Sequence, residues 1–107
     1  MCFMGYNKKY EAYRKQLYKT YTESIQELSR LNDGEIIEAT REELEGTIIP
    51  ELARLIDEIN NNSFPTRRTN RFLVSFSYAF RVWGWNIEHP TELFIDLCQL
   101  NKLYKDI

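Results

Sequence analysis

The side chains best suited to catalysis or metal binding are few in this sequence, and they are not grouped. There is one histidine, His89, directly before Pro90, and the two cysteines, Cys2 and Cys98, stand near opposite ends of the chain. One imidazole and two distant thiols cannot supply the ligands of a structural zinc site. A lone histidine in a loop that leads into a helix is usually a surface or capping residue, so we interpret His89 as structural.

Motifs for nucleophilic catalysis and phosphate binding are missing as well. Ser75 and Ser77 have no surrounding motif and no histidine close in sequence. The glycines are too scattered for a phosphate-binding loop, and the Glu-x-x-His pair of di-metal helical bundles does not occur. The acidic run at Glu42, Glu43 and Glu45 is typical of a solvated helix face. The sequence therefore predicts no enzyme activity, no cofactor and no metal.

The composition is that of one globular domain covering residues 1–107. The chain is 43% hydrophobic and 28% charged, which disfavours disorder as its main state. No secretory signal and no run of eighteen apolar residues is present, so we expect no membrane span. With only two cysteines, a structural disulfide is not expected, and the composition indicates a reducing, cytoplasmic setting.

Residues 6–31 carry apolar side chains at the three- and four-residue spacing of an α-helix. The charged residues between them, Glu23 and Glu27 included, predict a solvated opposite face. The turn signal Asn32-Asp33-Gly34 predicts where this helix ends. The predicted buried stripe consists of Tyr6, Tyr10, Tyr13, Leu17, Tyr21, Ile25, Leu28 and Leu31.

The next region predicts helices over about 35–45 and 48–60. Thr40 and Glu43 fit a capping box, and Thr47 could cap a new helix with Pro50 in its first turn. Because proline inside an unbroken helix costs roughly 3 kcal/mol or forces a kink, two short helices and one kinked helix both remain open. The predicted buried stripe is Ile37, Leu44, Ile48, Leu52, Leu55 and Ile59.

The run RFLVSFSYAFRVWGW, residues 71–85, fits either a strand or a helix by periodicity alone. A strand would lack partners in this chain, so we predict a helix over 69–83, with Thr66 or Thr69 as N-cap and Gly84 at its end. Since it is apolar around more than half of its circumference, we expect it to be the central, most enclosed helix. Its predicted buried face is Phe72, Leu73, Phe76, Ala79, Phe80 and Trp83, with Ser75, Ser77 and Arg81 turned away.

A last helix over about 91–104 completes an all-α, four- to five-helix antiparallel bundle, a single helical domain. Its predicted buried face is Leu93, Phe94, Leu97, Cys98 and either Leu100 or Leu103.

The charge is unevenly distributed along the chain. Residues 33–61 carry −7, whereas residues 1–32 carry +3 and residues 62–107 carry +2. Two interpretations compete: the acidic region pairs internally, or it docks a basic protein. In the second, tyrosines at its edge (Tyr13, Tyr18 or Tyr21) would add binding energy. The candidate partner-binding residues are Glu35, Glu38, Glu42, Glu43, Glu45, Asp57 and Glu58.

Two other functions compete with docking of a basic protein. Nucleic-acid binding through the lysines of the first helix and the Arg67, Arg68 and Arg71 cluster is disfavoured by a sequence pI of about 5.5. A structural subunit of a larger assembly would instead keep the aromatic helix partly exposed until a partner covers it.

In size, helical pattern and composition the chain resembles the small helical immunity proteins that bacteria make against their own bacteriocins and contact-delivered toxins. The segments that carry the resemblance are the acidic EIIEATREELEG and the aromatic SYAFRVWGWNIEHPTELF, which leads into the last helix. The resemblance implies a protein that binds and blocks a cognate toxin, often a basic nuclease. Because some bacteriocin immunity proteins are basic, the acidic segment favours the toxin-neutralising branch. No functional residue is carried over from the resemblance.

Overall fold

The computed structural model describes residues 4–61 and 72–107, and side chains from Lys8 onward. The described residues form helices and no strand, which confirms the predicted all-α bundle. None of these helices combines the length and the apolar character needed to cross a membrane. The helices are α1 (Met4–Asn32), α2 (Arg41–Glu43), the π-helical turn η1 (Leu44–Ile48), α3 (Ile49–Asn60), α4 (Val74–Arg81) and α5 (Glu92–Asp106).

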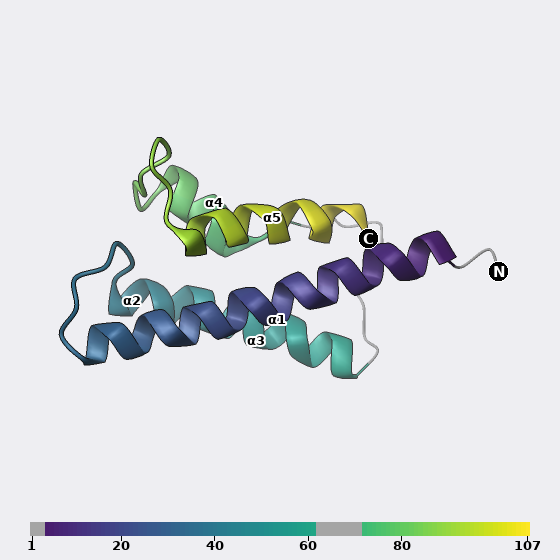
Figure 1. The fold of residues 1–107 in the computed structure, drawn as a ribbon, viewed down its shortest axis with the longest axis horizontal. Helices are drawn as coiled ribbons and strands as arrows, with labels where there is room; N and C mark the ends of the chain where they lie inside the picture. The colour runs from purple at the N-terminus through teal and green to yellow at the C-terminus, as the bar shows by residue number, and fades with distance from the viewer. Residues whose placement is uncertain (1–3, 62–71) are drawn as a thin grey trace.

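The helices are arranged as an antiparallel bundle (Figure 1). The long helix α1 lies along both α3 and α5, and α4 lies along α5. The loop between α1 and α2 and the loop between α4 and α5 are at the same end of the molecule (Figure 1). The other end holds the start of α1 and the end of α5.

The end of α1 is the predicted turn. Gly34 has a φ of 89°, a left-handed conformation that glycine adopts without steric cost. The amide of Gly34 donates to the carbonyl of Leu31 (3.0 Å), and the amide of Glu35 donates to the carbonyl of Arg30 (3.0 Å). These two hydrogen bonds form a Schellman motif, which satisfies carbonyls at the helix end.

The buried stripe of α1 differs from the predicted one after Leu17. Tyr13 and Leu17 are buried as expected, but Ile25 is 40% exposed. Each four-residue step advances the side chain by about 40° around the helix, so three such steps turn Ile25 away from the core. Thr20, Ser24 and Glu27 are buried in its place. The prediction that Glu27 belongs to the solvated face is therefore wrong, and Tyr6 lies outside the described side chains.

The predicted helix over 35–45 is wrong in its first half. The helix begins at Arg41, because Thr40 and Glu43 form the predicted capping box. The Thr40 side chain accepts a hydrogen bond from the Glu43 amide (3.1 Å), and the Glu43 carboxylate accepts one from the Thr40 amide (3.0 Å). Residues 35–39 precede this cap as a loop.

From Arg41 to Asn60 the chain forms one continuous helical segment with a π-helical turn in it. Thr47 lies inside this turn and does not cap a helix, so the two-helix alternative is wrong. Pro50 has no amide to donate to the carbonyl four residues earlier, and its ring would crowd that carbonyl in a regular helix. The wider turn resolves the conflict, with the Ile49 amide donating to the carbonyl of Leu44. The predicted stripe is buried, except for a half-buried Ile37 in the preceding loop.

The start of α4 is held by side chains from two other helices. Its N-cap position is Leu73, which offers no side-chain acceptor, while Thr66 and Thr69 lie outside the described residues. The carboxylate of Glu51 in α3 accepts hydrogen bonds from the Val74 amide (2.7 Å), the Ser75 amide (2.8 Å) and the Ser75 hydroxyl (2.6 Å). This buried carboxylate therefore replaces the missing cap. In addition, the Leu73 amide donates to the Asn101 side chain of α5 (2.7 Å).

The prediction that the aromatic helix is the most enclosed one is wrong. The buried residues of α4 are Ser75 and Ala79, whereas Phe72 and Phe80 are 51% and 47% exposed. The hydrogen bonds to Glu51 draw Ser75 inward, which turns the opposite, aromatic side outward. The helix spans Val74–Arg81 rather than 69–83.

A row of aromatic rings connects α4 and the loop after it to α5. Centroid separations are 5.8 Å for Tyr78 and Trp83, 5.6 Å for Trp83 and Trp85, 5.5 Å for Trp85 and Phe94, and 5.9 Å for Phe94 and Phe76. These separations and the tilted geometries are those that stabilise aromatic pairs. The row seats Trp85 in the core, where it is 4% exposed.

Helix α5 starts at the Thr91 N-cap, whose side chain accepts a hydrogen bond from the Phe94 amide (3.2 Å). The predicted Leu93, Phe94, Leu97 and Leu100 are buried, and Cys98 and Leu103 are half-buried. Three further buried residues of this helix were not predicted, namely Asp96, Asn101 and Tyr104.

Substitution of Glu51 tests its hydrogen bonds to the start of α4. Glu51→Gln replaces one acceptor oxygen by an NH₂ group that faces amide donors, so we expect a loss of about 2–4 kcal/mol in the free energy of unfolding. Urea denaturation followed by circular dichroism measures it. Glu45→Gln is the matched control: it removes only an exposed ion pair with Arg41 (3.6 Å), for which we expect less than about 1 kcal/mol. Equal stability of the two variants would contradict the role of Glu51.

Two glycine substitutions should have opposite effects. Gly46 is helical and nothing lies within 4 Å of an added Cβ, so Gly46→Ala should stabilise the protein by about 0.5–1 kcal/mol. Gly34→Ala places a side chain at a φ of +89°, which should destabilise the protein by about 1–2 kcal/mol. Thermal unfolding measures both changes, and a destabilising Gly46→Ala would contradict the helical description of residues 44–48.

Candidate protein-binding surface

The loops at one end of the bundle are tied together by two acidic side chains. The Glu38 carboxylate accepts a hydrogen bond from the Asn86 amide (2.8 Å). The Glu43 carboxylate accepts one from the Trp85 indole (3.1 Å), and the same oxygen also accepts the hydrogen bond from the Thr40 backbone amide. The loop after α1 is therefore fixed to the loop after α4, as their proximity in Figure 1 suggests.

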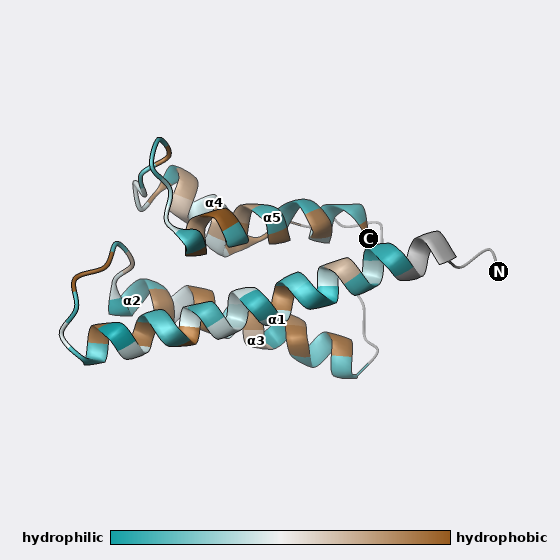
Figure 2. Cartoon of the chain, viewed as in Figure 1, coloured by the Kyte–Doolittle hydropathy of each residue, from teal (hydrophilic) through white to brown (hydrophobic). Residues whose placement is uncertain are grey.

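Within the loop after α1, one large apolar side chain points away from the protein. Ile36 is 99% exposed, whereas Ile37 is half-buried and Ala39 is 2% exposed. Figure 2 shows this hydrophobic stretch in a loop otherwise bordered by hydrophilic residues. Residues 33–45 contain six acidic side chains and one basic one. We call Glu35, Ile36, Glu38 and Glu42, all exposed, the acidic loop surface.

The structure divides the seven candidate carboxylates into groups. Glu43 is half-buried in the capping box. Glu45 pairs with Arg41, and Glu58 pairs with Arg54 at 3.0 Å. Asp57 and Glu58 also lie near the far end of α3, roughly 22 Å along the helix axis from Glu42 at 1.5 Å per residue. Internal pairing therefore accounts for some of the carboxylates, whereas Glu35, Glu38 and Glu42 lie at the surface.

The tyrosines expected beside the acidic region do not form part of this surface. Tyr13 is buried and its ring stacks on Tyr104 at 5.6 Å. Burial raises the pKa of Tyr13 well above its ordinary value, and the neighbouring Tyr104 adds to the effect. Tyr18 and Tyr21 are half-buried along α1, and the guanidinium of Arg14 lies 5.5 Å from the ring centroid of Tyr18.

Sequence reasoning missed an apolar groove between α4 and α5, because it assigned Phe80 to the core. The groove has a volume of about 150 Å³. Its exposed rim includes Phe80 (47%), Ile87 (60%) and Ile95 (52%). We call it the α4–α5 groove; it is lined by Phe76, Phe80, Ile87, Pro90, Phe94, Ile95 and Cys98.

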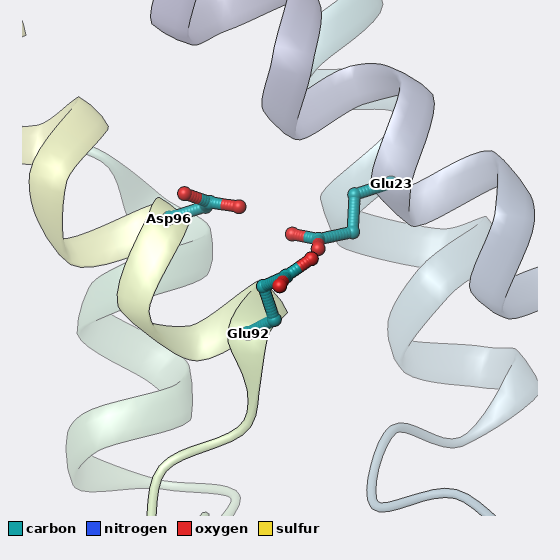
Figure 3. A group of neighbouring side chains, drawn as sticks. All are labelled: Glu23, Glu92 and Asp96. Atoms are coloured by element: carbon teal, nitrogen blue, oxygen red, sulfur yellow. The ribbon is translucent and has the colours of Figure 1, made fainter.

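A cluster of three carboxylates lies between α1 and α5 (Figure 3). Glu23, Glu92 and Asp96 each place an oxygen within 4.8 Å of the others. Glu92 and Asp96 are four residues apart and therefore share a face of α5. The expectation for Glu23 was a solvated position, but its carboxylate points at the other two. Among the described residues, this is the group whose oxygens are close enough to hold a metal ion.

The neighbours of the cluster shift two carboxyl pKa values in opposite directions. Burial, followed by hydrogen bonding to Asp96 and Glu92, raises the pKa of Glu23 to about 9. Burial acts to raise the pKa of Asp96 too, but hydrogen bonds from Glu23, Gln16 and Lys19 outweigh it and the pKa is lowered. The Gln16 amide lies 3.0 Å and the Lys19 ammonium 3.3 Å from the same Asp96 oxygen.

Comparisons of the chain with protein-family models, with characterised proteins and with solved structures found no match.

Two neighbouring glutamates should separate a structural role from a surface role. Glu43→Gln weakens the capping box and the contact with Trp85, so we expect a loss of about 1–2 kcal/mol in the free energy of unfolding. Glu42→Gln changes an exposed side chain with no hydrogen bond or ion pair among the described residues, so we expect a change within about 0.5 kcal/mol. Chemical denaturation of both variants measures the difference, and a larger loss for Glu42→Gln would contradict this division.

Proposed function

We propose that the protein is a non-catalytic inhibitor that binds a basic protein through the acidic loop surface. The observation that carries the proposal is the 99% exposed Ile36 among the carboxylates of Glu35, Glu38 and Glu42. An apolar side chain contributes affinity when a partner's pocket removes it from water. The surrounding negative charge favours a partner with a basic rim around such a pocket.

The way the surface is built supports this function. Hydrogen bonds to the loop after α4 hold the loop that carries Ile36, and buried Ala39 anchors it from within. A surface fixed before association loses less conformational entropy on binding than a free loop. The carboxylates would also accelerate encounter with a basic partner at low ionic strength.

The partner class follows from the resemblance to small helical immunity proteins. We propose a cognate toxin, nuclease-like and basic, that is neutralised when the acidic loop surface covers its active region. Inhibition of this kind needs no reactive group in the inhibitor, only a surface that stays in place. The proposed role is that of an antitoxin acting in the bacterial cytoplasm.

A second candidate function is supported by the α4–α5 groove. A structural subunit would use the exposed Phe80, Ile87 and Ile95 as a contact for another chain. This surface is apolar rather than acidic, so its partner would be selected by shape and not by charge. The two candidates therefore involve different residues and respond differently to salt.

Partner binding by a surface variant tests the proposal. The variant combines Glu35→Gln, Ile36→Ala and Glu42→Gln, and wild type and variant are used to capture partners from extracts of the native host. With the recovered partner, we expect the variant to bind at least about 30-fold more weakly, from the lost apolar burial and charge. The wild-type association rate should fall steeply with salt, and that of the variant should fall less.

Asp57→Asn is the matched control, since it removes an exposed carboxylate at the far end of α3 and should leave binding unchanged. Phe80→Ser combined with Ile95→Ser tests the second candidate. If this double variant loses the partner while the acidic loop variant retains it, the α4–α5 groove is the binding site and the proposed function is wrong.

A further inference from the structure

Two buried carboxylate oxygens face each other between α1 and α5. One oxygen of Glu23 and the Oδ2 atom of Asp96 are buried, and when both carboxylates are ionised neither atom accepts a hydrogen bond from another of the described residues. The Asp96 side chain is only 6% exposed, and its other oxygen already accepts from Gln16 and Lys19. Figure 3 shows Asp96 directed at Glu23. Two buried oxygens in this arrangement need either a proton shared between them, as in the hydrogen bond from Glu23 to Asp96 described above, or a cation that takes its place.

In the fully ionised cluster, the charges close to these oxygens leave a deficit of positive charge. Glu23, Glu92 and Asp96 carry −3 when all are ionised, and Lys19 contributes +1. The Lys19 ammonium lies 3.3 Å from one oxygen of Asp96 and is 61% exposed, so it leaves the other oxygen without a partner. A divalent cation that displaced the proton shared by Glu23 and Asp96 would balance the remaining −2.

The donor atoms and their spacing restrict the cation. All three ligands are carboxylate oxygens, which suit hard cations such as Ca²⁺ and Mg²⁺. Oxygens up to 4.8 Å apart can surround Ca²⁺, since opposite ligands at about 2.4 Å from the ion are about 4.8 Å apart. Mg²⁺ would require opposite ligands at about 4.2 Å, with near-ideal octahedral geometry.

The cluster is also open to solvent on one side. A surface hollow of about 360 Å³ lies over it, lined by residues that include Lys19, Glu23 and Glu92. The exposed Glu92 stands at the start of α5, where a cation can approach without unfolding either helix. Water molecules can complete the coordination from this side, as Ca²⁺ sites commonly allow.

We propose that Glu23, Glu92 and Asp96 form a Ca²⁺ site that links α1 to α5. The two helices pack extensively along each other, and a bound ion would add a bridge between the third turn from the end of α1 and the first turn of α5. With three protein carboxylates and the opposing charge of Lys19, the expected dissociation constant is weak, about 10⁻⁴–10⁻³ M. This site does not involve the acidic loop surface, so its test is independent of the proposed function.

Isothermal titration of the metal-free protein with CaCl₂ tests the site, with MgCl₂ as the comparison ion. We expect Ca²⁺ binding at one site with weaker Mg²⁺ binding, and at least about 10-fold weaker Ca²⁺ binding in Glu23→Gln. Glu92→Gln is the second ligand variant, because an exposed residue at a helix start can be changed with little risk to folding. Circular dichroism of each variant checks that the helices remain.

Lysine variants give a readout that a purely structural role of the cluster does not predict. Lys19→Met removes the competing positive charge, so Ca²⁺ should bind several-fold more tightly to it. Lys15→Met, an exposed lysine on the same helix, and Glu45→Gln, a carboxylate away from the cluster, are controls that should match wild type. The proposal is overturned if wild type and Lys19→Met take up no Ca²⁺ at about 10 mM, well above the expected constant. It is also overturned if Glu23→Gln binds Ca²⁺ as wild type does.

Discussion

The buried carboxylate of Glu51 is the interaction on which the position of the C-terminal half depends. It lies on α3 and accepts three hydrogen bonds from the start of α4. The helix dipole places partial positive charge at the N-terminus of α4, so the negative charge of Glu51 is stabilising there. By fixing where α4 begins and which side of it faces inward, Glu51 also sets the position of the aromatic row that follows.

The aromatic row connects α4 to the loop that carries the acidic loop surface. Trp85 packs against Phe94 of α5 and donates its indole hydrogen to Glu43, the last residue of α2. The backbone amide of the adjacent Asn86 donates a hydrogen bond to the Glu38 carboxylate. Residues that look unrelated in sequence are thereby joined, and the loop that presents Ile36 is supported by the core rather than by its own local structure.

Local chemistry made much of the fold predictable. The Gly34 turn and the capping box of Thr40 and Glu43 act within a few residues, and the buried leucines of α3 and α5 follow helical periodicity. Wrong expectations arose where distant residues decide the outcome. Ser75 is buried because Glu51 binds it, 24 residues away in sequence, and Phe80 is exposed because α4 turns its other side inward. The candidate carboxylates were identifiable by type, and the capping box marked Glu43 as structural, but the sequence could not show that Glu43 also binds the Trp85 indole or that Glu38 binds the backbone amide of Asn86.

The π-helical turn at Leu44–Ile48 bears on how this chain could vary in length. Such a turn holds about one residue more than a regular turn. From Leu44 to Leu52 there are eight steps, whereas two regular turns need about seven. A related chain lacking one residue here would keep both leucines on the inner face in a regular helix, provided that proline were absent from position 50. The turn therefore marks a place where the helix can hold one residue more or fewer without changing which side of it meets α1.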